Sequence, residues 1–202
     1  MNETLKRALS GAVYVAIMWM GTSYSELSFH VLFSVILVIC LYEMWKLRKG
    51  KTRILAFIYV LAPLLLIHLY SQKVILFIFI LTWTFDTFAY LFGVRFGKTK
   101  IMPSVSPKKS WEGFIGGFIF TVIASLITTR YFLDIDNIIA LVISLFLPFT
   151  ASLGDFIESY FKRKAGAKDS GKFIPGHGGM LDRMDAFMIT IPVLYIYLNI
   201  IV

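Results

Sequence analysis

The chain has 202 residues, of which 58% are hydrophobic and only 16% are charged, and its formal net charge is +8. Soluble domains usually carry about a quarter of their residues as charged side chains, so this composition excludes an ordinary soluble protein and indicates a polytopic integral membrane protein of the all-α class. The length suits a single domain, 1–202, of about seven membrane-spanning helices with roughly 20 residues each.

Apolar segments follow one another along the whole chain. The first comes directly after Lys6 and Arg7 and resembles a signal peptide, but it lacks a clear small-residue cleavage site and further spans follow, so we expect a membrane helix there. Two polar segments, 95–111 and 158–185, are expected to be loops. The expected spans are 8–23, 29–45, 54–70, 74–93, 112–131, 138–157 and 186–202.

The basic residues indicate how these spans are oriented. With seven spans, 18 of the 20 Lys and Arg residues fall on the side of the N-terminus, and only Lys73 and Arg130 fall on the other side, near the acidic turn of Asp134 and Asp136. The positive-inside rule therefore predicts a cytoplasmic N-terminus. Because topology explains most of the positive charge, we expect no nucleic-acid partner. The lone Cys40 permits no intrachain disulfide.

Topology does not explain four carboxylates within or beside the spans. Asp86 lies seven residues before Gly93, about 10 Å below the helix end, where an ionised group is costly without a partner or a watery cavity. Asp155 lies in the last turn of the sixth helix, and Asp182 and Asp185 open the seventh. The alternating helix directions place all four in the cytoplasmic half, where they can meet.

The spacing of these residues favours a metal site. If the sixth helix continues through Lys162, then Asp155, Ser159 and Lys162 share one helix face, and Asp182 and Asp185 share a face of the seventh helix. Carboxylates that converge from two helices suit a hard divalent cation such as Mg²⁺, which completes its octahedron with water and substrate phosphates.

Basic residues and a glycine-rich segment accompany the carboxylates. Gly176, His177, Gly178 and Gly179 would let backbone N–H groups approach an anion just before a helix N-terminus. His177 is either a phosphate-binding or proton-handling residue or a hydrogen bonder that fixes the loop. Metal ligands, cations and a glycine loop together describe phosphoryl or nucleotidyl transfer. The expected countercharges to the phosphates are Lys162, Arg163, Lys168 and Arg183.

The other polar loop has the same character. Lys108 and Lys109 precede the fifth span, and Ser110 is a plausible N-cap of that helix. The lysines are either ordinary positive-inside residues or phosphate ligands. Two adjacent lysines do not stabilise a helix start, because the helix dipole favours anions there, and a bound phosphate would reverse that penalty.

These residues resemble a known signature. Ser159-x-Phe161-Lys162-Arg163, then Lys168-Asp169-x-Gly171, then Ile174-Pro175-x-His177-Gly178-Gly179-Met180-x-Asp182-Arg183-Met184-Asp185 matches that of the phosphatidate cytidylyltransferase family over 27 positions. Asp86-Thr87-x-Ala89-Tyr90 and Ser106-Pro107-Lys108-Lys109-Ser110-Trp111-Glu112-Gly113 are similar to further segments of that family, with Ser110 in place of the usual Thr. The resemblance covers about the last 130 residues.

The resemblance implies a reaction in the cell inner (cytoplasmic) membrane, with the active site on the cytoplasmic side. CTP and phosphatidate would give CDP-diacylglycerol and pyrophosphate, with Mg²⁺ and often a monovalent cation such as K⁺, and a homodimer is an option. It implies Asp155, Lys162, Asp182 and Asp185 as catalytic residues, among which the three carboxylates bind metal, with Asp86 and Asp169 as further candidates. It implies as phosphate-binding residues Lys108, Lys109, Ser159, Arg163, Lys168, His177, Gly178, Gly179 and Arg183.

Two alternatives stay open. A cytidylyltransferase for another lipid phosphate, such as an ether lipid, would carry the same motif, whereas CDP-alcohol phosphotransferases carry a different core motif that is absent. A transporter of an anionic solute is the non-enzyme hypothesis, in which Asp86 would bind a coupling ion. It predicts two similar halves with broken helices in matching places, and no internal repeat is visible.

Overall fold

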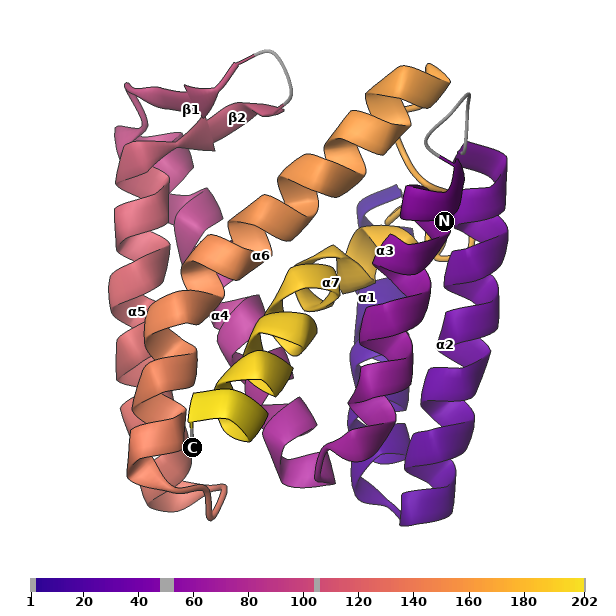
Figure 1. Ribbon diagram of the computed structural model, residues 1–202. Coiled ribbons are helices and arrows are strands. Elements are labelled where there is room, and N and C mark those ends of the chain that lie inside the picture. The colour runs from indigo at the N-terminus through magenta and orange to yellow at the C-terminus, as the bar shows by residue number, and fades with distance from the viewer. Residues whose placement is uncertain (1–2, 48–52, 104–105, 202) are drawn as a thin grey trace.

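The computed structural model describes residues 3–47, 53–103 and 106–201. Within these residues, seven α-helices run alternately toward the two ends of one bundle (Figure 1). A 3₁₀ turn, Ile67–Leu69, extends α3, and a π-helical turn, Tyr197–Ile201, extends α7. The helices are α1 (Glu3–Ser23), α2 (Glu26–Leu47), α3 (Arg53–Leu66), α4 (Gln72–Phe96), α5 (Trp111–Tyr131), α6 (Asn137–Ala165) and α7 (Leu181–Ile196).

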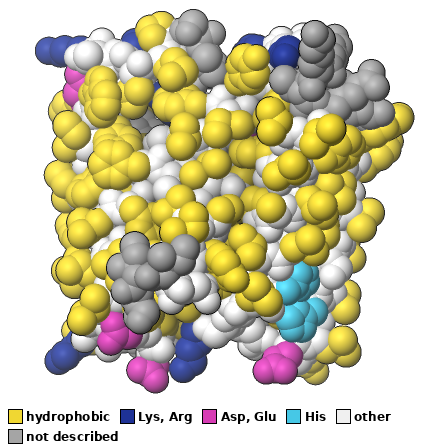
Figure 2. Space-filling model, viewed as in Figure 1, with side chains coloured by type: hydrophobic (Ala, Val, Ile, Leu, Met, Phe, Trp, Pro, Cys, Tyr) yellow, Lys and Arg dark blue, Asp and Glu magenta, His cyan; other side chains and the backbone are white. Residues whose placement is uncertain are grey.

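The bundle has the surface of a membrane protein. Figure 2 shows hydrophobic side chains over the sides of the molecule, with charged side chains gathered at its two ends. Four described helices, α2, α4, α5 and α6, are long and apolar enough to cross a membrane, whereas α1 and α3 contribute shorter apolar stretches. The prediction of an all-α integral membrane protein is confirmed, and the number of seven crossings stays a prediction. The basic residues 48, 49 and 51 lie outside the described residues.

The expectation of a plain loop at 95–111 is wrong. Strands β1 (Lys100–Met102) and β2 (Ser106–Ser110) form an antiparallel hairpin there. The Glu112 carboxylate anchors the hairpin by accepting hydrogen bonds from the backbone N–H groups of Lys98 and Thr99, each at 3.1 Å. The expected N-cap is confirmed, because the Ser110 side chain accepts a hydrogen bond from the Gly113 N–H at 3.2 Å.

Glycines allow two helix pairs near the hairpin end to pack closely. On α5, a Cβ at Gly113 or Gly117 would lie against the backbone carbonyl of Ala89 or Phe85 on α4. On α6, a Cβ at Gly154 would clash with the backbone carbonyl oxygen of Asp185 on α7. The helix that carries Asp155 therefore lies directly against the helix that carries Asp185.

Helix α6 carries residues from the apolar core to the end of the bundle. Asp136 caps its N-terminus and accepts hydrogen bonds from the N–H groups of Ile138 and Ile139, and Gly166 caps its C-terminus with a φ of 71°. Its 29 residues span about 43 Å at 1.5 Å per residue, which exceeds the roughly 30 Å of a bilayer core. Figure 1 shows α6 running obliquely to the hairpin end of the bundle, so its last turns can present polar side chains there.

Candidate active site

Three carboxylates meet where α6 and α7 cross, and we call them the acidic group: Asp155 and Glu158 on α6 and Asp185 on α7. One oxygen from each lies within 4.8 Å of the others. Glu158 is 0% exposed, and its Oε1 atom has no hydrogen-bond partner among the described residues. An orphaned carboxylate oxygen beside two further carboxylates fits a hard divalent cation such as Mg²⁺.

Two lysines contact the acidic group. Lys109 of the hairpin lies 2.9 Å from Asp155. Lys162, which is only 8% exposed, lies 2.6 Å from Glu158 and 2.8 Å from Asp182. The acidic group and Asp182 together supply four carboxylates, against only two lysines. The resulting excess of negative charge is one that a divalent cation would offset.

Asp182 has a different environment from the acidic group. Besides Lys162, its carboxylate accepts hydrogen bonds from the N–H groups of Ser170 at 3.0 Å and Gly179 at 2.7 Å. Asp182 precedes the apolar part of α7. Burial by itself would raise the pKa of the Asp182 carboxyl, but the hydrogen bonds that it receives lower this pKa below its usual value. Asp182 is therefore held ionised, with both oxygens engaged, and its role as a metal ligand stays a prediction.

The glycine turn, Gly176–Gly179, packs against the Asp182 carboxylate. Gly176 and Gly178 have φ values of 77° and 89°, in the left-handed region that other residues rarely adopt, and a Cβ at Gly178 would meet the Asp182 carboxylate. The His177 N–H donates to the Ile174 carbonyl at 3.0 Å, and the Gly179 N–H donates to Asp182. These two expected phosphate donors are thus engaged within the protein, and their binding to phosphate stays a prediction.

Helix α1 holds the glycine turn from the other side. The Ser10 hydroxyl donates a 2.7 Å hydrogen bond to the Pro175 carbonyl and lies 3.1 Å from Nδ1 of His177. Arg183 donates a 2.7 Å hydrogen bond to the His177 carbonyl. Of the two readings of His177, these contacts favour the one in which it fixes the loop, although its ring also lines a cavity.

Glu43 is a buried carboxylate that the sequence pattern does not single out. It lies near the end of α2, is 3% exposed, and accepts hydrogen bonds from the N–H groups of Met180 at 3.1 Å and Leu181 at 2.9 Å. It also accepts a 2.9 Å hydrogen bond from the Ser170 hydroxyl. Glu43 therefore fixes both ends of the segment 170–181 and lies at the N-terminus of α7, where the helix dipole favours an anion.

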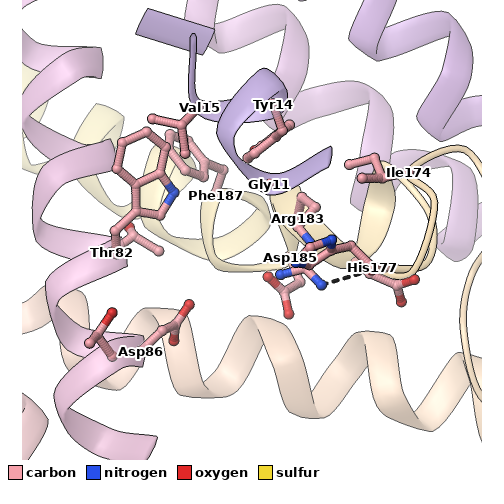
Figure 3. A pocket seen from close by; sticks show the side chains of 13 residues that line it. Gly11, Tyr14, Val15, Thr82, Asp86, Ile174, His177, Arg183, Asp185 and Phe187 are labelled. Atoms are coloured by element: carbon pink, nitrogen blue, oxygen red, sulfur yellow. Dashed lines mark hydrogen bonds between the residues drawn. The ribbon is translucent and has the colours of Figure 1, made fainter. Parts of the chain in front are cut away.

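Three cavities are lined by residues of the site, and Asp185 of the acidic group lines one of them. The central cavity, about 420 Å³, lies between α1, α4 and α7 and is lined by Tyr14, Thr82, Asp86, Arg183 and Asp185 among others (Figure 3). Asp86 also lines the hairpin cavity, about 520 Å³, together with Lys100, Lys108 and Lys109. Ile174, His177 and Arg183 also line the turn cavity, about 640 Å³, together with Lys168, Asp169 and Lys172. The shared residues make the three cavities neighbours, with the central one in the middle.

The structure brings together most of the residues expected at the site. Asp86 and Asp185 line the central cavity, and Asp155 lies with Asp185 in the acidic group. Asp182 contacts Lys162, which also pairs with Glu158 of that group, so the four aspartates meet as the alternating helix directions predict. Three expected phosphate ligands line none of these three cavities: Ser159, Arg163 and Gly179. Arg163 donates a hydrogen bond to the Ala167 carbonyl at 3.1 Å.

The fold and the site define a class: a helical membrane protein with a carboxylate site, flanked by lysines, at one end of its bundle. Comparison with known proteins gives the family. The model of the cytidylyltransferase family matches residues 54–201, and the chain belongs to that family.

Individual relatives agree with this assignment. The chain is 49% identical over 126 residues to a phosphatidate cytidylyltransferase of Staphylococcus aureus (strain COL), an alignment that covers 61% of this chain and 48% of the relative. It is 46% identical over 125 residues to a phosphatidate cytidylyltransferase of Thermotoga maritima, covering 59% of this chain and 46% of the relative. The chain thus spans about half the length of the curated relatives it matches.

Proposed function

We propose that this protein transfers the cytidylyl group of CTP to a lipid phosphate, phosphatidate, and so forms CDP-diacylglycerol and pyrophosphate. The observation that carries the proposal is the acidic group of Asp155, Glu158 and Asp185, which lies beside Lys109 of the hairpin cavity and contributes Asp185 to the central cavity. Family membership and the printed names of the relatives support it.

The cavities suggest where each substrate binds. The hairpin cavity combines lysines with apolar residues, and its lining includes Tyr90 and Val94, which are 68% and 71% exposed on α4. This combination suits a lipid whose phosphate contacts Lys108 and Lys109 and whose chains leave sideways into the membrane. The central and turn cavities are lined by Arg183, His177 and Lys168, among other residues, and suit the nucleotide and its phosphates.

The reaction needs little beyond positioning and charge neutralisation. The lipid phosphate is already an anionic nucleophile, so its oxygen attacks the α-phosphorus of CTP without a strong general base. One phosphorus–oxygen bond forms there, and the bond to the β-phosphate breaks and releases pyrophosphate. Lys109 orients the attacking phosphate, while Arg183 and Lys168 stabilise the departing pyrophosphate. Mg²⁺ held by the acidic group, with a monovalent cation such as K⁺ beside it, would neutralise charge on the phosphates.

We place the active site on the cytoplasmic side of the bacterial inner membrane. The hairpin, the glycine turn and the N-terminus lie at the same end of the bundle (Figure 1). That end carries most of the Lys and Arg residues in the sequence, as the positive-inside rule requires of a cytoplasmic face.

Reconstitution tests the proposal directly. Purified protein in detergent, given labelled CTP, phosphatidate and Mg²⁺, should form labelled CDP-lipid, and EDTA should stop the reaction. Replacing K⁺ by Na⁺ measures the dependence on a monovalent cation. An ether-linked lipid phosphate offered in place of phosphatidate defines the lipid preference. No CDP-lipid with either lipid, together with uptake of an anionic solute into proteoliposomes, would refute the enzyme assignment.

A further inference from the structure

Two buried hydroxyl groups of the central cavity lack partners. Thr82 Oγ1, on α4, and Tyr14 Oη, on α1, have no hydrogen-bond partner among the described residues. Thr82 is only 5% exposed, and both residues line the central cavity. Figure 3 shows Thr82 one turn from Asp86 on α4, with Tyr14 on α1 across the cavity. Most buried polar groups are hydrogen-bonded, so this pair calls for an explanation.

The neighbouring helices show what a threonine hydroxyl usually does in this protein. Besides Thr129, which donates to Ser125, four helical threonines donate to a backbone carbonyl one turn earlier, which satisfies the hydroxyl within its own helix. They are Thr84, Thr121, Thr150 and Thr190, which donate to Ile80, Gly117, Phe146 and Ala186. Thr82 makes no such bond in the described structure, although it lies on the same helix as Thr84. Its hydroxyl therefore keeps an unused hydrogen-bonding capacity beside the central cavity.

Aromatic rings form the remaining wall beside these hydroxyls. Trp83 and Phe187 line the central cavity, and Phe79 packs behind both, with ring centroids 5.6 Å and 4.5 Å away. Flat rings next to hydrogen-bonding groups suit a nucleobase, which stacks through its faces and bonds through its edge. An acyl chain would leave both hydroxyls unpaired, and would place hydrocarbon beside Asp86 and Asp185.

We infer that this inner part of the central cavity binds the pyrimidine base of the nucleotide, with Thr82 and Tyr14 hydrogen-bonding its edge. The inference rests on the proposed nucleotidyl transfer. The base then lies one helical turn from Asp86, and the phosphates extend toward Asp185, Arg183 and His177 in the same cavity. Tyr14 lies before residues 54–201, so α1 supplies a substrate contact from outside the segment that matches the family.

Two conservative variants test the inference. Thr82→Val and Tyr14→Phe remove only the hydroxyls and keep the shapes of the side chains. Each should raise the KM for CTP about five- to tenfold, the effect of one lost hydrogen bond. The KM for phosphatidate and the inhibition constant of pyrophosphate, which has no base, should stay within about twofold of the wild-type values. Calorimetric titration of the detergent-purified protein with CTP should show the same loss of affinity without turnover.

Thr22→Val is the matched control. Thr22 Oγ1 is also buried and without a partner among the described residues, but Thr22 lines none of the three cavities. Thr22→Val should leave the KM for CTP, the KM for phosphatidate and the inhibition constant of pyrophosphate unchanged. An unchanged KM and affinity for CTP in both variants would overturn the inference, as would a rise in the KM for phosphatidate, which would assign this region to the lipid. A wild-type protein that binds CTP but forms no CDP-lipid would instead refute the proposed function alone.

Discussion

Replacing Glu43 should destabilise the protein although this residue touches no part of the acidic group. Glu43→Ala removes an acceptor of three hydrogen bonds and leaves the N–H groups of Met180 and Leu181 and the Ser170 hydroxyl buried without that partner. At about 1 kcal/mol for each bond, the free energy of unfolding should fall by about 3 kcal/mol. For a chain of this size, the corresponding fall in Tm is roughly 6–12 °C.

Thermal unfolding in detergent measures the effect. Glu43→Gln keeps the volume and one acceptor oxygen, so it should lose about half as much stability as Glu43→Ala. Glu26→Gln is the control, because Glu26 is exposed on the first turn of the same helix and should change the free energy of unfolding by less than about 0.5 kcal/mol. A Glu43→Ala protein with the wild-type Tm would refute the reasoning that this carboxylate holds segment 170–181.

Three further predictions concern the site and one exposed ion pair away from it. Asp185→Asn should lower turnover at least about 10²-fold while the protein still inserts into membranes, and near-normal turnover would remove Asp185 from the metal ligands. Lys162→Met should cost about 3–5 kcal/mol in thermal unfolding because it leaves Glu158 and Asp182 without their buried cation. Adding Glu158→Gln to Lys162→Met should restore part of the lost free energy of unfolding, because it removes one of the unpaired buried charges. A double variant no more stable than Lys162→Met would contradict the pairing of Lys162 with Glu158. Lys73→Ala breaks a 3.8 Å ion pair between exposed groups at the other end, so a change above about 0.5 kcal/mol would be unexpected.

The sequence predicts much of this architecture because two signals in it are strong. Long apolar runs predict where the helices lie in the sequence. The alternation of helix directions then predicts that Asp86, Asp155 and Asp185 can meet in the same half of the bundle. The residues between the spans are less predictable, since the hairpin at 100–110 depends on hydrogen bonds to Glu112 that leave no periodic pattern.

The residues that the sequence analysis did not identify were missed for different physical reasons. Glu158 lies three residues after Asp155, on the same helix face, so helical spacing alone could have identified it. Glu43 could not be found in this way, because it bonds to the backbone of residues more than 130 positions away in the sequence. The role that we propose for Tyr14 likewise depends on the packing of α1 beside the central cavity. The hydrogen bonds that engage Asp182 likewise depend on the fold of the glycine turn.

The contact between Ser10 and the glycine turn has a practical consequence for handling the protein. The start of α1 lies at the same end of the bundle as the hairpin and the glycine turn, whereas the C-terminus lies toward the opposite end (Figure 1). If the nucleotide of the proposed reaction enters the site from this end, an affinity tag or fluorescent fusion at the N-terminus would crowd that entrance. Purification handles and reporter proteins belong at the C-terminus, where they leave that entrance clear.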